Sequence, residues 1–423
     1  MSNPTVIAVV VAWNRAQLLR ETLDGLASQT RPLDGVVVVD NASSDETPQL
    51  IASHPAVTNV VTLPQNYGGA GGFAAGIARA MTLGADLVWI MDDDTIPTPT
   101  ALEVLLRTRE EYPGTPAVLA CRADWIDGRE HPMNAPRERF LISRELREHA
   151  AAVGARQIRT ASFVAIMIDA RAIEEEGLPE AAYFLWNDDF EYTARLLKGR
   201  VGLYVDGARV EHRTKTFGNS TADPGPRFYN EVRNKVWALG TSSGFGLFDR
   251  CAFGAATALR WAKMIAASAD REAALGYLRE GLRDAWRPPL RSSEILHLTE
   301  VADEVAALEQ GRRACGCSCE CSSSSPEACG CSEGEPRRQS QTFRFCSLSM
   351  QGISRSSSSV QFPARRANKS CAHASWLLCA MVPSPKRFRN FFTALREGKK
   401  PKFWETLMSG SSDLSAIWDW RMP

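Results

Sequence analysis

The fold is decided by residues 87–94, LVWIMDDD, in which five apolar residues lead directly into three aspartates. A short apolar run bounded by polar residues is typical of a strand that is buried on both faces of a sheet. Earlier in the chain, strand-like and helix-like patterns alternate. The strand-like runs cover 6–11, 35–39 and 57–63, and the helix-like spacing covers 17–27 and 73–83. This alternation predicts an α/β fold with a Rossmann-like, mostly parallel sheet and helices on both faces.

Each predicted strand ends close to a polar residue. Asn14, Asp40 and Asn66 follow the first three strands, and Asp92 follows the fourth. Ligands of open α/β sheets bind beyond the C-terminal ends of the strands. We therefore expect these side chains to line one ligand site.

The three aspartates are suited to a metal ion. Carboxylate oxygens are natural ligands of Mg²⁺ and Mn²⁺, which in turn bind the oxygens of a diphosphate. Side chains at i and i+2 of an extended backbone point the same way, so Asp92 and Asp94 can share one metal. Asp93 would then face away or contact a ribose. The alternative is a solvated acidic turn that precedes a helix near Pro97, and the buried strand before the triplet favours the metal site.

A second acidic group, formed by Asp188, Asp189 and Glu191, lies among aromatic residues. A carboxylate at the edge of an aromatic pocket has a raised pKa, which suits a general base acting on a sugar hydroxyl. Trp186 is placed to stack on a sugar ring, although a tryptophan is also a common core residue. The alternative for the acids is a favourable interaction with the dipole of the helix that follows them.

Residues further along the chain complete the candidate site. His212 lies in a segment that is expected to return to the edge of the sheet, where it can complete the metal site. A polar group beyond it is predicted to bind the phosphates of a substrate, with a solvated helix face as the alternative. This group consists of Arg227, Arg233 and Asn234.

The stretch at 66–73, NYGGAGGF, follows a predicted strand and precedes a helix. A dinucleotide fingerprint occupies such a position, and Gly69, Gly71 and Ala74 match a loose form of it. A dehydrogenase is disfavoured because the stretch belongs to the third strand and no partner for a nicotinamide is evident. We expect instead that Gly71 and Gly72 let the backbone approach a nucleotide sugar. A nucleotidyltransferase is also disfavoured, since it would need a basic glycine-rich loop after the first strand.

Composition narrows the class of protein. Lys and Arg together number 49, as do Asp and Glu, and a formal net charge of zero argues against a general nucleic-acid-binding protein. The sequence contains no stretch of about 18 uncharged apolar residues, so we predict no transmembrane helix. The start of the chain does not resemble a secretory signal, so we expect a cytoplasmic protein.

The chain is expected to divide into four segments. We predict a catalytic domain at 1–245 and a helical extension at 246–310. Residues 311–385 are rich in Ser and Cys and are predicted to be disordered, with binding of a soft metal as the alternative. Residues 386–423 mix basic and aromatic side chains, which suits a helix on an anionic membrane surface. A helix that packs on the catalytic domain is the alternative for this last segment.

Together these motifs resemble the family 2 glycosyltransferases, which are inverting enzymes with a nucleotide-diphospho-sugar-binding fold called GT-A. The resemblance covers residues 5 to about 240 and rests on five motifs. They are VVVAWNR at 9–15, the spaced run of Leu23, Leu26, Gln29 and Thr30, VVVDNASSD at 37–45, the glycine-rich stretch and the aspartates. Within the family, residues 68–73 and 186–192 look most like galactofuranosyltransferases, with rhamnosyltransferases of similar layout as the alternative. Ala12 departs from the pattern, which usually has Thr or Ser there.

The resemblance implies roles for individual residues. Asp92, Asp94 and His212 would hold Mn²⁺ or Mg²⁺ together with the diphosphate of the donor. Asp189, with its neighbour Asp188, would supply the general base. Donor contacts are expected from Asn14, Arg15, Asp40, Asn66, Gly71, Gly72 and Asp93, with Asp40 at the nucleotide base. Acceptor or phosphate contacts are expected from Trp186, Glu191, Arg227, Arg233 and Asn234.

The resemblance also implies the substrates. The donor would be UDP-galactofuranose, or dTDP-rhamnose in the alternative, and the acceptor a saccharide linked to polyprenyl diphosphate. A lipid-linked acceptor favours peripheral contact with the inner face of the cell membrane. A nucleotide-sugar-binding protein without catalysis is the alternative from another class.

Overall fold

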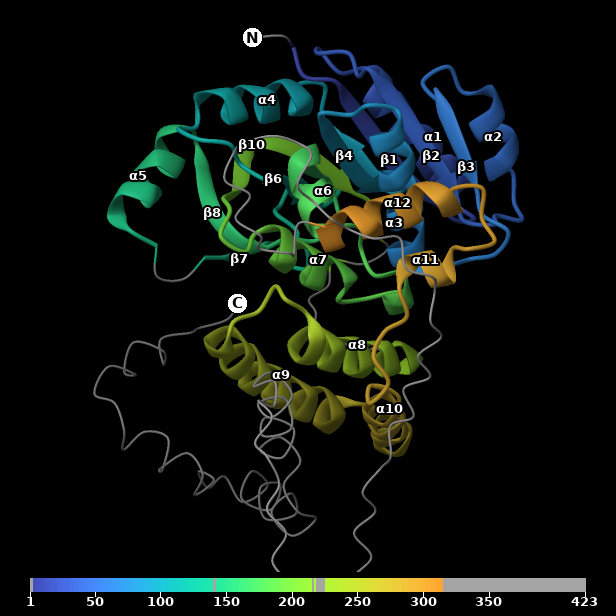
Figure 1. Ribbon diagram of the computed structural model, residues 1–423, viewed down its shortest axis with the longest axis vertical. Coiled ribbons are helices and arrows are strands. Elements are labelled where there is room, and N and C mark those ends of the chain that lie inside the picture. The colour runs from blue at the N-terminus through green and yellow to red at the C-terminus, as the bar shows by residue number, and fades with distance from the viewer. Residues whose placement is uncertain (1–2, 140–141, 215–216, 218–224, 315–423) are drawn as a thin grey trace, which may run out of the picture. The chain divides into compact units, whose positions relative to one another are not determined.

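The computed structural model describes residues 3–139, 142–214, 217 and 225–314, with side chains to residue 310. Within these residues the chain forms one ten-stranded sheet with helices on both faces (Figure 1). The strands are β1 (Val6–Ala12), β2 (Gly35–Asp40), β3 (Asn59–Thr62), β4 (Leu87–Asp92), β5 (Thr95–Pro97), β6 (Val118–Asp124), β7 (Arg137–Glu138), β8 (Ala155–Thr160), β9 (Ile166–Asp169) and β10 (Gly202–His212).

The helices alternate with these strands in the first half of the chain and follow one another in the last part. They are α1 (Ala16–Ala27), α2 (Thr47–Ser53), α3 (Gly68–Thr82), α4 (Ala101–Glu111), α5 (Arg144–Ala152), α6 (Ala170–Glu176), α7 (Asp188–Leu196), α8 (Phe228–Thr241), α9 (Leu247–Ala267), α10 (Arg271–Asp284), α11 (Ser292–Ile295) and α12 (Ala302–Ala314). Two short 3-10 helices lie at Ala181–Tyr183 and Gly225–Arg227.

The order of strands is β3-β2-β1-β4-β9-β6-β10-β8-β7, and β5 pairs with β10. The first four strands in this order are parallel, as is the pair β6 and β10. β9 runs antiparallel between β4 and β6, so the sheet is mixed beyond its first half. The expected α/β fold is thus confirmed.

Two apolar cores lie on the two faces of the sheet because β1 alternates its side chains between them. Val9 and Val11 face α3, whereas Val10 faces α1. All three belong to a strand that is buried along its whole length. Full burial of a valine or leucine side chain contributes roughly 1.5–3 kcal/mol, so these two cores hold the sheet rigid under the site.

α3 explains the glycine-rich stretch in a way that the sequence did not predict. The helix begins at Gly68 rather than at residue 73, so the glycines belong to its first turns and not to an open loop. A Cβ on Gly72 would lie 2.5 Å from Val11 Cγ1, and one on Gly76 would lie 2.4 Å from Val9 Cγ1. The glycines therefore allow the helix backbone to lie directly on β1.

The helices that follow β10 form two groups, and the predicted extension at 246–310 contributes to both. α8, α9 and α10 pack on one another through a core that includes Phe228, Met264 and Leu278. α11 and α12 instead return to the body of the sheet, where Val301 and Val305 join the core that α3 covers. Arg79 on α3 forms an ion pair of 2.9 Å with Glu304 on α12, and Figure 1 shows the two helices side by side.

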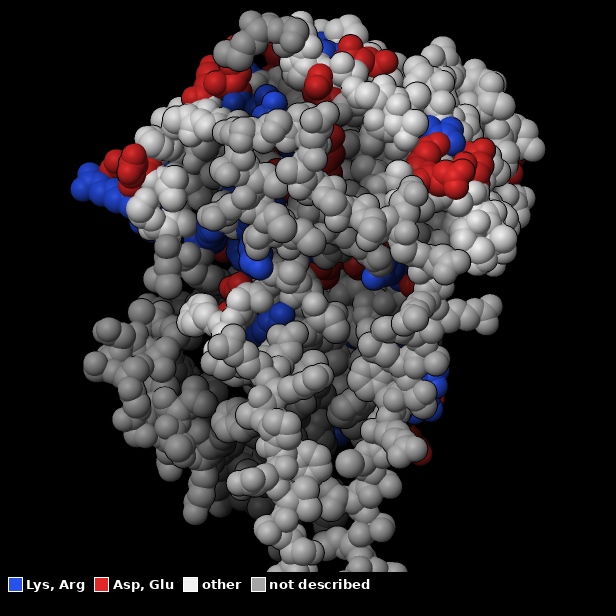
Figure 2. Space-filling view, viewed as in Figure 1, with Lys and Arg blue, Asp and Glu red and all other residues white. Residues whose placement is uncertain are grey.

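The surface carries mixed charge. On the face shown in Figure 2, acidic and basic side chains of the described residues are intermixed, in keeping with the zero formal net charge. No helix among the described residues is long and apolar enough to span a bilayer. The predictions for residues 315–423, including the cysteine-rich segment and the basic-aromatic tail, lie outside the described residues.

Candidate active site

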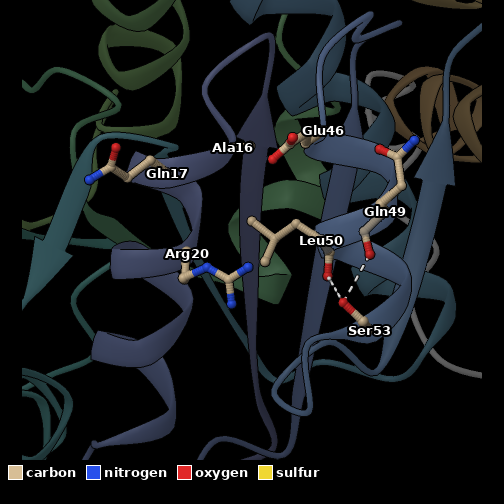
Figure 3. Close-up of a pocket in the computed structure, with 7 residues that line it drawn as sticks. All are labelled: Ala16, Gln17, Arg20, Glu46, Gln49, Leu50 and Ser53. Atoms are coloured by element: carbon tan, nitrogen blue, oxygen red, sulfur yellow. Dashed lines mark hydrogen bonds between the residues drawn. The ribbon is translucent and has the colours of Figure 1, made fainter.

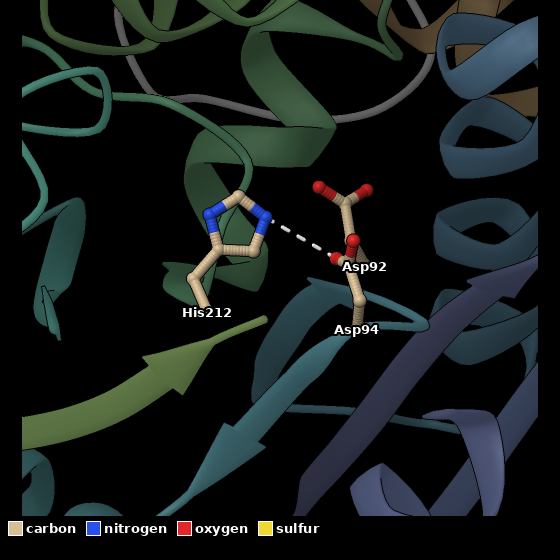
Figure 4. Close-up of side chains that lie close together, drawn as sticks. All are labelled: Asp92, Asp94 and His212. Carbon is tan, nitrogen blue, oxygen red and sulfur yellow. Dashed lines mark ion pairs between the residues drawn. The ribbon is translucent and has the colours of Figure 1, made fainter. Parts of the chain in front are cut away.

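The three residues predicted to bind a metal meet where β4 and β10 end. β5 follows the aspartates and pairs antiparallel with β10, which sets Thr95 opposite His212 and brings the imidazole beside Asp94. One ligand atom from each of Asp92, Asp94 and His212 lies within 4.8 Å of the others (Figure 4). The prediction that these three residues lie together therefore agrees with the geometry.

Asp94 has an oxygen that suits a cation. Its Oδ1 is buried and makes no hydrogen bond, although His212 Nε2 lies 3.2 Å away. A buried carboxylate oxygen without a hydrogen-bond partner is costly, and coordination of a metal would satisfy it. Two carboxylates and an imidazole form a mixed oxygen and nitrogen set, which fits Mn²⁺ or Mg²⁺.

His212 is oriented by a residue that the sequence analysis missed. Its Nδ1 lies 2.9 Å from Asn134 Oδ1, which can only accept a hydrogen bond, so the proton resides on Nδ1. In the neutral ring Nε2 then carries the lone pair and faces Asp94, and protonation of Nε2 makes the two side chains an ion pair of 3.2 Å. Asn134 comes from the turn after β6, far from His212 in sequence, and no local pattern points to it.

The three side chains of this cluster shift one another's pKa values in different directions. Burial and the nearby Asp94 carboxylate raise the pKa of Asp92 to about 6. Burial alone would raise the pKa of Asp94, but His212 and Arg15 outweigh it and the pKa is lowered. Burial would lower the pKa of His212, yet the same carboxylates raise it. The half-buried Asp92 carboxylate, which has no ion pair of its own within the described residues, and the buried Asp94 carboxylate together form a site suited to a divalent ion.

Arg15 and Asp93 connect the cluster to the loop after β1. Arg15 Nη1 lies 3.1 Å from Asp93 Oδ1 and 2.5 Å from Asp94 Oδ2. The other oxygen of Asp93 accepts a hydrogen bond of 3.0 Å from the backbone of Trp13. Burial raises the pKa of Asp93 to about 7 against the pull of Arg15. Asp93 thus holds this loop, whereas Arg15 is half exposed and borders the metal cluster.

The other predicted donor residues lie at the C-terminal ends of β1, β2 and β3. Asn14 has a positive φ of 54° and accepts a hydrogen bond of 2.7 Å from the backbone of Ser44. Asp40 is buried and accepts one of 2.9 Å from the backbone of Ser43. Asn66 accepts one of 2.7 Å from the backbone of Gly68. These three side chains therefore shape the loops around the site.

Gly71 and Gly72 are buried against protein rather than open to a ligand. A Cβ on Gly71 would lie 2.5 Å from Tyr67 Cβ, and Gly72 faces Val11. The close approach that these glycines allow is between helix and strand, so their predicted contact with the donor finds no support in this packing. A nearer neighbour of the site is Gly69, where a Cβ would lie 3.9 Å from Asp188 Oδ2.

The second acidic group begins α7 next to the metal cluster. Burial and the charge of Asp189 raise the pKa of Asp188 well above its usual range, and the charge of Asp92 adds to this. Burial also raises the pKa of Asp189, but the backbone N–H of Phe190 and the cation of Lys235 oppose the shift. The pKa of both aspartates is therefore raised, and the Phe190 N–H and Lys235 favour the ionised form of Asp189 against the effect of burial.

The loop before α7 is strained and is held by α8. Phe184, Trp186 and Asn187 all have positive φ angles between 62° and 71°. Such backbone costs about 1–3 kcal/mol per residue outside glycine and persists only where the surroundings enforce it. Asn234, which is fully buried, donates to the carbonyls of Tyr183, Leu185 and Trp186 at 2.8–2.9 Å.

Three predicted acceptor contacts have other roles in the structure. Arg233 Nη2 donates to the carbonyls of Ala182 and Tyr183, and Asn234 is committed to the same loop. Glu191 is buried in an ion pair of 3.0 Å with Arg195 and accepts a hydrogen bond from Ser242. These side chains hold the loop and α7 in place, while Trp186 is half-buried in the loop and Arg227 is exposed at the start of α8.

A surface pocket lies apart from this cluster. It has a volume of about 530 Å³ and is lined by α1 and α2 residues, among them Gln17, Arg20 and Gln49 (Figure 3). Ser53 at its edge donates to the carbonyls of Gln49 and Leu50, which closes the end of α2. None of the metal-cluster residues lines it, so we do not assign the chemistry to this pocket.

Comparison with known proteins agrees with these observations. Residues 7–175 match the family described as glycosyl transferase family 2. The chain is 31% identical to galactofuranosyltransferase GlfT1 of Mycobacterium tuberculosis over 255 residues, which cover 56% of this chain and 82% of that protein. It is 29% identical to GlfT1 of Mycolicibacterium smegmatis over 197 residues, which cover 46% of this chain and 65% of that relative's length.

Solved structures with similar folds include Staphylococcus aureus TarS. One has a TM-score of 0.48 and 17% identity, and covers 74% of this chain and 54% of that chain. A second, of TarS residues 1–349 with UDP-GlcNAc, has a TM-score of 0.49 and 16% identity, and covers 74% of this chain and 90% of that chain. On the family match and the extent of the GlfT1 alignment, this chain belongs to glycosyl transferase family 2, with the GT-A fold, and is most like the galactofuranosyltransferases.

Proposed function

We propose that this glycosyltransferase moves galactofuranose from UDP-galactofuranose, with inversion and with Mn²⁺ or Mg²⁺, onto a lipid-linked saccharide. The observation that carries the proposal is the cluster of Asp92, Asp94 and His212 beside Asp188 and Asp189. The choice of sugar rests on similarity to the galactofuranosyltransferase GlfT1. The choice of a polyprenyl-diphosphate acceptor rests on the resemblance of residues 68–73 and 186–192 to galactofuranosyltransferases that use such an acceptor.

The chain's own residues can perform a single displacement. Asp189 Oδ2 would take the proton of the acceptor hydroxyl, because Oδ1 is engaged by the backbone N–H of Phe190 at 2.6 Å. Asp92, Asp94 and His212 would bind the metal, which when present neutralises the departing nucleoside diphosphate. Asn134 keeps Nε2 of His212 available for this purpose.

Donor binding is assigned to the loops at the ends of β1 and β2. Asp40 is buried at the end of β2, and Asn14 at the end of β1 is fixed by Ser43 and Ser44. A nucleotide base held there would direct its diphosphate toward the metal cluster at the end of β4. Arg15 borders that cluster and is half exposed, which suits a contact with the diphosphate.

The test is transfer by the full-length protein with Mn²⁺ and a panel of nucleotide sugars that includes UDP-galactofuranose and dTDP-rhamnose. The readout is release of nucleoside diphosphate with and without a polyprenyl-linked acceptor mimic. We expect acceptor-dependent release from UDP-galactofuranose alone, and loss of release after chelation of the metal. Release from dTDP-rhamnose would assign a rhamnosyltransferase, and metal-dependent nucleotide binding without release would leave a nucleotide-sugar-binding protein.

A further inference from the structure

Lys235 is a buried cation without a counter-ion. The residue is 4% exposed on α8, and its Nζ lies 3.7 Å from the centroid of the Phe190 ring. Within the part of the chain that the structure describes, its ammonium group has neither a hydrogen bond nor an ion pair. A buried, unpaired ammonium destabilises a protein by several kcal/mol, so its presence calls for a functional reason.

The nearest candidate counter-ion is already engaged. Glu231 lies one helical turn before Lys235, but its carboxylate accepts from Arg260, from Trp261 Nε1 at 3.1 Å and from Asn187 Nδ2 at 2.7 Å. Burial lowers the pKa of Lys235 to about 7, and Arg260 and Arg137 repel its charge, although Glu231 and Asp189 attract it. The local charges therefore favour an additional anion.

A second unpaired cation faces the same ring from a distant part of the chain. The guanidinium carbon of Arg137, on β7, lies 5.8 Å from the centroid of Phe190 and 5.7 Å from that of Phe253. Its guanidinium group has no hydrogen bond or ion pair within the described residues, and the residue is exposed. Of the two cations around Phe190, Arg137 is thus exposed to solvent and Lys235 is buried.

We propose that Lys235 and Arg137 form a second anion-binding subsite, which takes a phosphate or diphosphate group of the acceptor. The acceptor assignment rests on the proposed function, whereas the binding of an anion does not. Phe190 directly follows Asp189, so an acceptor anchored here by its phosphate would reach the general base with its sugar. With Lys235 protonated, the cations Arg137, Lys235 and Arg260 outnumber the anions Glu231 and Asp189 by one, and a phosphate would balance this excess.

The experiment is calorimetric titration of inorganic pyrophosphate into the full-length protein without divalent metal. Lys235→Met and Arg137→Gln should each weaken binding roughly tenfold or more, because each removes one charge-assisted hydrogen bond. Lys235→Arg should retain most of the affinity. Lys263→Met, which removes an exposed lysine of the neighbouring helix α9, should leave the affinity unchanged. Thermal unfolding of each variant establishes that it is folded.

A second titration identifies which substrate supplies the phosphate. Pyrophosphate is added to protein saturated with Mn²⁺ and UDP, and continued binding supports an acceptor subsite. Competition by UDP would assign the cations to the donor and overturn the acceptor assignment. Absence of pyrophosphate binding, or equal binding by wild type and Lys235→Met, would overturn the subsite altogether. Because neither titration depends on sugar transfer, a wrong choice of sugar would leave both results interpretable.

Discussion

Asn134 fixes the tautomer of His212 through a hydrogen bond of 2.9 Å between Oδ1 and Nδ1. Asn134 is itself held by its backbone bond of 3.0 Å to His131 and by contact with Ser162. The imidazole therefore already presents Nε2 to Asp94, in the orientation that binding of a metal would require. This relationship adds a residue outside every recognised motif to the candidate metal site.

Replacement of that amide should weaken metal binding without unfolding the protein. Asn134→Ala leaves His212 free to rotate and to protonate Nε2, and loss of such a supporting contact typically costs about 10–100-fold in metal affinity. Mn²⁺ binding followed by electron paramagnetic resonance would measure it. Gln49→Ala, which removes an exposed amide on α2, is the matched control. Equal Mn²⁺ affinity in wild type and Asn134→Ala would contradict the role given to this residue.

Asp189→Asn should abolish transfer while donor binding persists. Removal of a general base lowers the rate by about 10²–10⁴-fold, whereas the metal cluster keeps its three ligands. The measurements are the rate of nucleoside diphosphate release and the affinity for UDP with Mn²⁺. Asp127→Asn, at an exposed turn, serves as the control. A variant that retains the wild-type rate would remove Asp189 from the reaction and direct attention to Asp188.

Lys235→Met should stabilise the fold, and the gain should depend on pH. The pKa of Lys235 is lowered from 10.5 to about 7 in the folded protein, so folding releases a proton between these values and stability falls as the pH decreases toward 7. The Lys235→Met variant has no ammonium group at this position, so it does not lose this stability as the pH falls. Its advantage should be full below about pH 7 and should vanish near about pH 10.5. Denaturant unfolding at several pH values measures it, and an advantage independent of pH would show that the ammonium charge is not the cause.

Two alanine substitutions at helical glycines should have opposite effects. Gly76→Ala places a Cβ 2.4 Å from Val9 and should destabilise the protein by about 1–3 kcal/mol through overpacking. Gly276→Ala lies on α10, where nothing is within 4 Å of the added Cβ, and should stabilise it by up to about 1 kcal/mol. Urea unfolding distinguishes the two, and a stabilised Gly76→Ala variant would mean that α3 does not rest on β1 as described.

The sequence predicted the structure best where a strand pattern leads directly into residues of the candidate site. Residues 87–94 predicted both the central strand and the acids after it, because a buried strand and an aspartate pair each have a recognisable spacing. The antiparallel insertion of β9 between β4 and β6 could not be predicted, since the pairing of a strand depends on distant partners. The same applies to Asn134, Lys235 and Arg137, whose importance arises only from contacts between elements far apart in the chain.

The glycine-rich stretch shows that one sequence pattern is compatible with two different explanations. Glycine permits a close approach of any neighbour, whether ligand or protein, and the sequence does not say which. At Gly72 the neighbour is Val11, so the stretch serves packing. Asn234 is a similar example. The sequence predicts that this polar helix residue contacts a phosphate, whereas in the structure its amide donates to three backbone carbonyls.

The return of α12 to α3 has a consequence for synthesis on the ribosome. Arg79 and Glu304 are separated by 225 positions, and Val301 and Val305 complete a core whose other members come mainly from the first 205 residues. The apolar surface of α3 that α12 covers therefore stays exposed until about 220 further residues have been translated, which at elongation rates of about 5–20 residues per second takes tens of seconds at most. During that interval the nascent chain is a natural client for chaperones that shield apolar helices.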